Sequence, residues 1–249
     1  AFQEWDVGAF ERFEGFFAIA LFVPAERRLV LCRDRIGKKP IYLYEDGERV
    51  VWASEIKALL ALLPGERARL NEGAVRRYLH LGLRDHGHET FWSNFRMMGR
   101  AEYRTYIDGG EAGRGAYWSL PAARLDAREV SVPEAGRRLE RVLREAIELR
   151  LVADVPISSD LSGGLDSSAL VALRATMSDE PFPVFSVRYE DPAVDETPYA
   201  RMVAARFPQI EHVFIDHDEA LFWDQLEEFV HVQEEPFHNP NILVNQNVR

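Results

Sequence analysis

The chain has 249 residues, of which 47% are hydrophobic and 29% charged, a composition typical of a globular protein with a sizeable core. Its formal net charge of -11 argues against a nucleic-acid partner, because a nucleic-acid-binding surface needs a basic stripe. The single cysteine, Cys32, excludes an intrachain disulfide, and its place in the apolar run RLVLCRD indicates a buried structural thiol. No apolar run approaches the roughly 18 to 20 residues of a membrane span, and the start lacks the features of a signal peptide. We therefore expect no membrane partner and a cytoplasmic location.

The chain starts with Ala1 rather than methionine and stops at Arg249 within the run LVNQNVR. We interpret both ends as cuts through folded sequence and expect a fragment. As a prior, the length indicates one or two domains, and the pattern of predicted strands and helices changes near residue 120.

The first region, residues 1–120, is rich in predicted strands. They are Phe16 to Val23, Arg28 to Asp34 and Arg49 to Ser54. Turn signals such as PAERR and YEDGER separate these runs. The segment Glu55 to Leu63 predicts a short helix that Pro64 and Gly65 stop. Consecutive strands with short turns indicate an antiparallel sheet with helices packed on it.

A connector, Pro121 to Arg128, leads into the second region, residues 121–249. Ser131 and Glu134 have the spacing of a capping box, and Pro133 fits the first turn of the helix that follows. The next apolar positions are Leu139, Val142, Leu143, Ala146, Ile147 and Leu151. Their spacing predicts an amphipathic helix.

From Asp154 onward, predicted strands and helices alternate. The strands are Ile157 to Leu161, Val184 to Tyr189 and Glu211 to Ile215, and the helices are Asp166 to Met177, Glu196 to Phe207 and Glu219 to Val230. This alternation indicates an α/β arrangement, a parallel, doubly wound sheet with helices on its faces. Ligands bind such sheets beyond the carboxyl ends of the strands, and the loop LSGGLDSS follows the first strand directly.

The composition of this loop points to phosphate binding. Gly163 and Gly164 permit unusual dihedral angles and let backbone N–H groups approach a ligand closely. The next helix offers unpaired N–H groups, and the hydroxyls of Ser162, Ser167 and Ser168 add donors. The loop is neither a Walker A loop, whose lysine is absent, nor a G-x-G-x-x-G dinucleotide loop.

Asp166 would repel phosphate unless a cation lies between them. Mg²⁺ is usually held by one or two carboxylates together with phosphate oxygens, so Asp166 predicts a magnesium ion bound with the phosphates. The alternative is that Asp166 only favours the helix start and the glycines only turn the chain.

The run SGGLDSS resembles the pyrophosphate loop of N-type ATP pyrophosphatases, which cleave ATP between its α and β phosphates and adenylate a substrate. Other segments are similar to the glutamine-dependent asparagine synthetase family in particular. They are FEGFFAIALF, CRDRIGKKPIYLY, WASEIKALL, TFWSNFRMM, VFSVRYED and QEEPF, and they span most of the chain in the family's order.

The resemblance implies two domains. Residues 1–120 would be part of an antiparallel N-terminal-nucleophile glutaminase domain, and residues 121–249 the start of an ATP pyrophosphatase domain. The implied reaction uses ATP and Mg²⁺ to adenylate the side-chain carboxylate of aspartate, and ammonia released from glutamine then displaces AMP. A homodimer is one assembly that it suggests.

The residues implied to hold ATP and pyrophosphate are Leu161, Ser162, Gly163, Gly164, Asp166, Ser167, Ser168 and Val187, with Asp166 also holding the metal. Glu234 and Glu235 are expected either near the acyl substrate or in a surface loop after a helix. No glutaminase catalytic residue is assignable, because the family's nucleophile is a cysteine at residue one and Ala1 cannot serve. Without that residue and the family's later segments, we expect the fragment alone to be inactive.

Two alternatives remain open. The run DLSGG, which begins at Asp160, also occurs in relatives that close amide rings, such as β-lactam synthetases and lasso-peptide cyclases. The other alternative is a nucleotide-binding module without catalysis, against which the intact loop argues.

Overall fold

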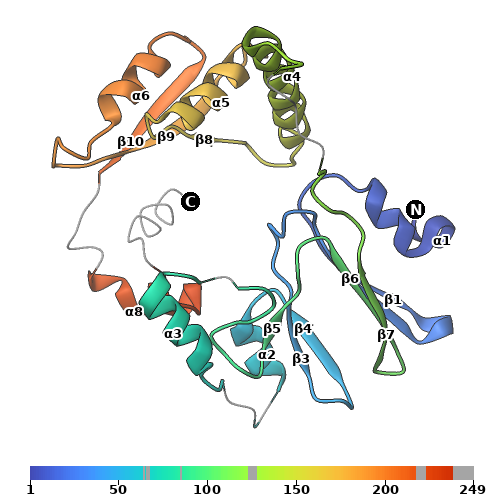
Figure 1. Ribbon diagram of the computed structural model, residues 1–249. Coiled ribbons are helices and arrows are strands. Elements are labelled where there is room, and N and C mark those ends of the chain that lie inside the picture. Colours follow the sequence, from blue (N-terminus) through green and yellow to red (C-terminus); the bar gives the residue numbers. More distant parts are fainter. Residues whose placement is uncertain (64, 66–67, 85, 123–127, 217–222, 238–249) are drawn as a thin grey trace. The chain divides into compact units, whose positions relative to one another are not determined.

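The computed structural model describes residues 1–249 except 64, 66–67, 85, 123–127, 217–222 and 238–249. The chain forms two compact units (Figure 1). Unit 1 comprises Ala1–Ala122 and Val230–His238, and unit 2 comprises Ala123–Phe229 and Asn239–Arg249. The chain therefore leaves unit 1, builds most of unit 2, and returns to unit 1 at Val230.

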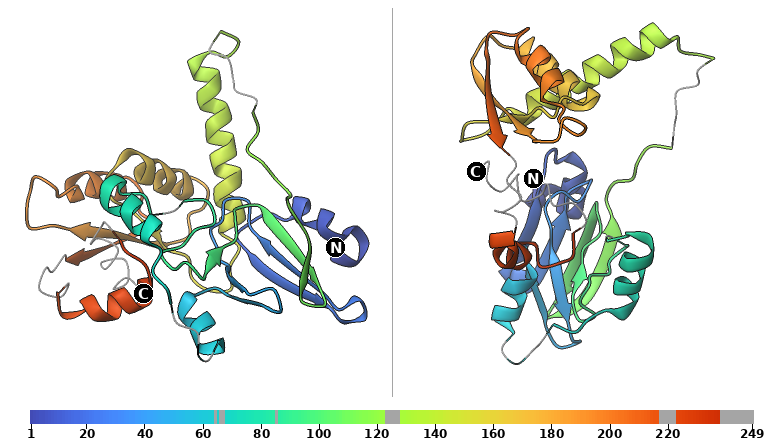
Figure 2. Two further views of the ribbon diagram at one scale, coloured as in Figure 1. Left: turned by 60° about the horizontal axis from the view of Figure 1, so that its bottom comes forward. Right: turned by 90° about the vertical axis from the view of Figure 1, so that its left-hand side faces the viewer.

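Unit 1 contains two antiparallel sheets (Figure 2). The first has the order β1-β2-β6-β7, with β1 (Ala18–Val23), β2 (Arg28–Arg33), β6 (Glu102–Ile107) and β7 (Gly110–Ala116). The second has the order β4-β3-β5, with β3 (Tyr42–Glu45), β4 (Val50–Ala53) and β5 (Arg96–Met97). The helices are α1 (Phe2–Trp5), α2 (Ile56–Leu62) and α3 (Glu72–Leu81), with 3₁₀ turns at Asp6–Arg12 and Pro24–Glu26. Helix α8 (Leu226–Gln233) begins in unit 2 and enters unit 1 at Val230. The predicted antiparallel sheet and the short helix after Glu55 are confirmed.

Strand β2 is buried on both faces, which fixes the layering of unit 1. Successive side chains of a strand point to opposite faces, so Leu29 and Leu31 pack against Leu43 of the second sheet, while Val30 and Cys32 belong to an aromatic cluster on the other side. Helix α2 packs on the outer face of the second sheet. The two sheets thus lie between helical segments, and the thiol of Cys32 is buried as predicted.

The charged turn after β2 organises the edge of this sheet. Asp34 is fully buried, and its carboxylate accepts hydrogen bonds from the backbone N–H groups of Lys38 and Lys39, each at 2.9 Å. The neighbouring Arg33 guanidinium donates to the carbonyl of Lys39 at 2.8 Å and also to that of Gly37. Because buried polar groups must be paired, these residues stabilise the turn.

The β6–β7 hairpin was not predicted, although its turn carries a recognisable signal. Asp108 and Gly109 both have positive φ values, 50° and 84°, as a tight hairpin turn requires. An Asp-Gly pair is a strong signal for such a turn. This turn joins β6 to β7, and β6 in turn pairs with β2, which is distant in sequence.

Unit 2 contains a parallel sheet of order β10-β9-β8, as the alternating pattern predicted. Its elements are α4 (Val132–Arg150), β8 (Ser159–Asp160), α5 (Leu165–Ala175), β9 (Phe182–Arg188), α6 (Thr197–Ala204) and β10 (Ile210–Asp216). One hydrophobic cluster joins Leu161 and Val184 of the sheet region to Val171 of α5 and Ala200 of α6. Both helices therefore cover the same sheet face (Figures 1 and 2).

One local prediction needs correction. Helix α4 follows Ser131 as expected, but the Ser131 side chain makes no capping hydrogen bond. The Glu134 carboxylate instead pairs with Arg137 and Arg138, each within 2.8 Å, so the capping box does not form. Of the last predicted helix, Glu219 to Val230, residues 219–222 lie outside the described residues, residues 223–224 and 226–230 are helical, and α8 continues to Gln233. Among the helices that the structure describes, none combines the length and apolar character needed to cross a bilayer.

Candidate functional site

The loop Ser162–Ser168 follows the carboxyl end of β8 and runs into the first turn of α5, which begins at Leu165. The backbone N–H of Leu161 donates to the carbonyl of Phe185 on β9 at 2.8 Å, so sheet pairing continues to the edge of the loop. The preceding Ser159 has a structural role, because its Oγ accepts a hydrogen bond from Arg174 of α5 at 3.0 Å. The loop is thus fixed to the sheet at its start and to a packed helix at its end.

Gly163 occupies a position where only glycine fits. Its φ is 95°, a value that other residues rarely adopt. A Cβ atom built on it would lie only 2.4 Å from the carbonyl oxygen of Glu196, just before α6. The loop backbone therefore packs directly against the backbone of the next strand-to-helix connection.

Serine hydroxyls preform the rest of the loop. The Oγ atoms of Ser162 and Ser167 are 2.8 Å apart, and the backbone N–H of Gly164 donates to Ser162 Oγ at 3.2 Å. The Ser168 backbone N–H already donates to the carbonyl of Gly164, as part of the first helical turn. These contacts hold Ser162 and Ser167 at the N-terminus of α5, where the helix dipole favours an anion.

A hollow of about 570 Å³ opens beside this loop. Its described lining residues are Asp160, Leu161, Ser162, Phe185, Ser186, Val187, Tyr189, Val194, Glu196 and Ile215. Three of the predicted residues, Leu161, Ser162 and Val187, therefore line one cavity. The lining combines apolar residues with the polar side chains of Asp160, Ser162, Ser186 and Glu196, a mixture that is usual for small-molecule sites.

Sequence reasoning missed Ser186, a buried polar residue in the middle of β9. Its hydroxyl donates to the carbonyl of Leu161, and its Oγ lies 2.7 Å from Nε2 of His212 on β10. Burial, together with the nearby positive charge of Arg201, lowers the pKa of His212. A serine inside the run PVFSVRY could have been noticed in the sequence as a polar residue in a predicted buried strand. Its partners, Leu161 and His212, could not, because they lie on two other segments.

Asp166 lies exposed in the first turn of α5, outside the lining of the hollow. Among the described residues, no three His, Cys, Asp or Glu side chains come together as a metal site. A magnesium ion that takes most of its ligands from phosphate oxygens and water needs only one or two carboxylates. As an exposed carboxylate within the loop that is predicted to bind phosphate, Asp166 fits that kind of binding.

Comparisons with known proteins extend these observations to most of the chain. Residues 1–118 match the family described as glutamine amidotransferase domain, and residues 138–245 match the family described as asparagine synthase. The chain belongs to the asparagine synthetase family. The family is one of ATP-dependent amidotransferases and ligases, in agreement with the prediction that the loop on the parallel sheet binds phosphate.

Three relatives illustrate the range of similarity. A putative asparagine synthetase (glutamine-hydrolyzing) 2 of Methanocaldococcus jannaschii is 30% identical over 91% of this chain and 44% of its own length. Asparagine synthetase (glutamine-hydrolyzing) 3 of Bacillus subtilis is 27% identical over 95% of this chain and 40% of its own length. Amidase chry2 of Gibberella zeae is 26% identical over 69% of this chain and 25% of its own length. The chain thus spans less than half the length of these relatives.

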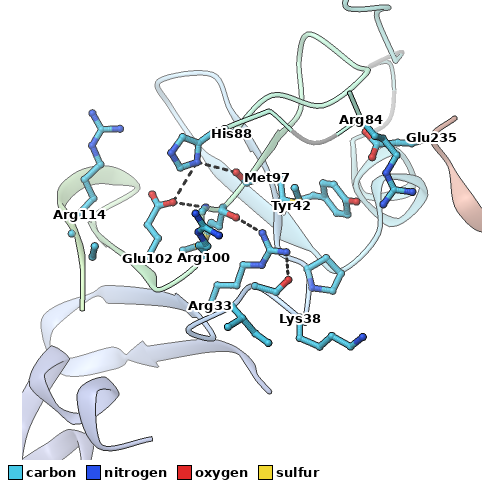
Figure 3. A pocket seen from close by; sticks show the side chains of 18 residues that line it. Arg33, Lys38, Tyr42, Arg84, His88, Met97, Arg100, Glu102, Arg114 and Glu235 are labelled. Atoms are coloured by element: carbon cyan, nitrogen blue, oxygen red, sulfur yellow. Dashed lines mark hydrogen bonds and ion pairs between the residues drawn. The ribbon is translucent and has the colours of Figure 1, made fainter. Parts of the chain in front are cut away.

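Unit 1 of this synthetase-family chain has a hollow of its own, of about 950 Å³ (Figure 3). Arg33 projects into it, and Arg84 and Glu235 lie on the side away from Arg114. The described lining residues include no serine, threonine or cysteine, so they supply no aliphatic hydroxyl or thiol nucleophile. Burial and the nearby Glu235 raise the pKa of Tyr42 in this wall to about 12, so the phenol stays neutral.

Glu234 and Glu235 belong to unit 1, where they contact backbone groups. The carboxylate of Glu234 accepts hydrogen bonds from the backbone N–H groups of Ile56, at 2.9 Å, and of Lys57. The carboxylate of Glu235 accepts one from the backbone N–H of Phe91 at 3.1 Å. These long-range contacts had no signal in the sequence.

Proposed function

We propose that this chain is part of a glutamine-hydrolysing, asparagine synthase-type ligase that forms a carbon–nitrogen bond at the expense of ATP. In this proposal the aspartate side-chain carboxylate attacks the α-phosphorus of ATP, and pyrophosphate leaves. Ammonia from glutamine then attacks the acyl carbon, and AMP leaves with the former carboxylate oxygen. Adenylation is needed because a carboxylate is a poor electrophile.

The observation that carries the proposal is the preformed loop Ser162–Ser168 beside the hollow of unit 2. Ser162 and Ser167 would donate hydroxyl hydrogen bonds to the pyrophosphate portion of ATP, and the first turn of α5 would add backbone N–H donors. Gly163 lets the loop backbone pack on Glu196 and so sets its shape. Leu161 and Val187 would provide apolar contacts for the nucleotide in the same hollow.

Asp166 would hold Mg²⁺ together with the phosphate oxygens, since it is an exposed carboxylate where the loop enters α5. Bound Mg²⁺ would neutralise negative charge on the phosphates and on the leaving pyrophosphate. Gly164, Ser167 and Ser168 complete the proposed phosphate contacts. All of them lie at the junction of the loop with α5.

We assign residues 1–120 to a partial glutaminase domain and residues 121–249 to the start of the ATP pyrophosphatase domain. The proposed partners are the small molecules aspartate, ATP and glutamine or ammonia, and the proposed assembly is a homodimer in the cytoplasm. The matches to the two families over residues 1–118 and 138–245 support this division.

The test is ATP–pyrophosphate exchange by a complete protein that carries this sequence, assayed with each candidate carboxylate. Aspartate should support exchange, and Asp166→Ala should reduce it by about a hundredfold or more, because a lost metal contact removes charge stabilisation. Asp179→Ala, at an exposed position outside the loop, is the matched control and should leave the rate unchanged. Full exchange by Asp166→Ala would refute the metal role.

A ring-closing amide synthetase of the β-lactam synthetase or lasso-peptide cyclase type is the second candidate. The observation that favours it is Asp160, which lines the hollow directly beside the phosphate loop and belongs to the DLSGG run. Exchange with a larger acid that carries its own amine, and none with aspartate, would select this candidate. ATP binding without exchange for any acid would instead indicate a nucleotide-binding module without catalysis.

A further inference from the structure

The chain is attached to unit 1 at a second place, far along the sequence. It leaves unit 1 after Ala122 and rejoins it at Val230, so residues 123–229 of unit 2 are flanked in the sequence by two segments of unit 1. The rejoining segment, Val230–Phe237, lies within the range that matches the asparagine synthase family. We call residues Glu234–Phe237 the strap, and its contacts with unit 1 show what this second attachment does.

Glu234 supplies the N-terminal cap that helix α2 lacks locally. The residue before the helix, Glu55, makes no side-chain capping hydrogen bond. The two carboxylate oxygens of Glu234 accept the first two helical N–H groups, those of Ile56 and Lys57, and the Lys57 ammonium lies 3.9 Å away. A carboxylate here satisfies otherwise unpaired donors and interacts favourably with the helix dipole.

The backbone of Glu234 has a conformation that favours glycine, which indicates that its side chain is needed at this position. Its φ is 59°, in the left-handed region that glycine normally occupies at the end of a helix. Its N–H donates to the carbonyl of Val230 at 2.9 Å, which closes the last turn of α8. A glutamate therefore stands where glycine would be less strained, and its side chain is only 11% exposed. The carboxylate contacts with α2 offset that backbone cost.

The next residues of the strap extend the attachment. Glu235 accepts a hydrogen bond from the backbone N–H of the buried Phe91 at 3.1 Å, and the hydroxyl of Tyr78 donates to the carbonyl of Phe237 at 2.8 Å. The rings of Tyr78 and Phe91 pack edge to face, 5.6 Å between centroids. Glu235 also forms part of the wall of the unit 1 hollow (Figure 3).

We propose that Glu234 and Glu235 form a latch that holds the segment after α8 on unit 1, and that Glu234 is a positioning residue for the transfer of ammonia to the acyl-adenylate. The second half of this proposal rests on the proposed function. With the latch closed, both segments that flank residues 123–229 in the sequence are held within unit 1. Opening it would release one of these two segments, so glutamine hydrolysis would continue while less of the ammonia reached the acyl-adenylate.

The experiment uses a complete protein that carries this sequence and compares three variants. Glu234→Gly removes the carboxylate and relieves the positive φ, whereas Glu234→Gln keeps the size of the side chain and removes its charge. Glu227→Gln, at an exposed position on the preceding helix α8, is the matched control. Two readouts are measured: hydrogen exchange of the peptide that contains Ile56 and Lys57, and the ratio of glutamine hydrolysed to AMP formed.

The latch predicts exchange about tenfold faster in Glu234→Gly, since hydrogen bonds to a charged group are lost, and unchanged exchange in Glu227→Gln. The positioning role predicts a higher ratio of glutamine to AMP, with normal AMP formation when ammonium salt replaces glutamine. Unchanged exchange in both Glu234 variants would overturn the latch. Faster exchange with an unchanged ratio would overturn the positioning role. If the wild-type protein forms no AMP, the proposed function fails, and the exchange result still decides the latch.

Discussion

At Gly163 the backbone leaves no room for a side chain, because φ is 95° and a Cβ would meet the carbonyl oxygen of Glu196 at 2.4 Å. We predict that Gly163→Ala distorts the loop and weakens ATP binding by about tenfold or more, as expected when strain of roughly 1–3 kcal/mol must be relieved. Titration calorimetry with ATP and Mg²⁺ measures the loss. Gly136→Ala is the control, since its Cβ would meet nothing within 4 Å, and it should leave affinity intact. Equal affinities for the two variants would contradict the prediction.

Cys32 offers a second test at the scale of one residue. Its side chain is fully buried, and this burial, with Asp34 close by, raises the pKa of the thiol to about 12. Because the thiolate is the reactive form, native protein should resist alkylation by iodoacetamide at Cys32, while denatured protein should react readily. Mass spectrometry of the Cys32 peptide gives both rates. Rapid alkylation of native protein would show that the thiol is accessible.

Single residues also show how far the sequence can be interpreted. The requirement for glycine at position 163 followed from the motif, because glycines in such loops usually serve a positive φ or a close approach. The partner that makes the requirement strict, Glu196, lies on another connection and has no sequence signal. Glu234 is similar: its role in capping α2 depends on a contact with Ile56, which lies 178 positions earlier in the chain.

At the scale of elements, local patterns predicted the strands and helices that alternate in unit 2 and the first strands of unit 1. They did not predict the order of strands in the first sheet, because β2 pairs with β6, whose partner residues lie 71 (Cys32 and Tyr103) to 79 (Arg28 and Ile107) positions later. The cap predicted at Ser131 failed because nearby arginines compete for Glu134. Helix periodicity survives such competition, whereas the geometry of a helix end does not.

The contact between β9 and β10 predicts a dependence of stability on pH. His212 has a pKa lowered below its ordinary 6.5 by burial and by Arg201, and its Nε2 lies 2.7 Å from Ser186 Oγ. As the pH falls below 6.5, the unfolded chain binds a proton that the folded imidazole resists, so unit 2 should lose stability. The loss is at most about 1.4 kcal/mol for each pH unit between the two pKa values.

Thermal unfolding of unit 2 between pH 7.5 and 5.5 (roughly one unit either side of an unperturbed histidine) measures this loss. His212→Gln should flatten the dependence, because glutamine does not titrate. His80→Gln, exposed on α3, is the control and should leave it unchanged. The same slope in His212→Gln as in the wild type would show that another group is responsible.

At the scale of the whole molecule, the hydrophobic clusters of the described residues each lie within one unit. Three are in unit 1 and one in unit 2. Unit 1 is further stabilised by the buried Arg104 of β6, which pairs with Glu102 at 2.7 Å and reaches Glu45 of the second sheet at 3.0 Å. Separate cores of this kind predict two unfolding transitions rather than one.

Each transition should respond to a different perturbation. Arg104→Ala leaves Glu102 and Glu45 without their partner, so the unit 1 transition should be destabilised by about 3–5 kcal/mol while the unit 2 transition stays in place. ATP with Mg²⁺ at a hundred times its dissociation constant should stabilise only unit 2, by about 2.7 kcal/mol, because a ligand stabilises the state that binds it. Differential scanning calorimetry of the wild type and the variant, with and without ATP, measures all four cases. If one transition moved under both perturbations, the two units would fold as one cooperative body, and the latch formed by Glu234 and Glu235 would be the first contact to test as its cause.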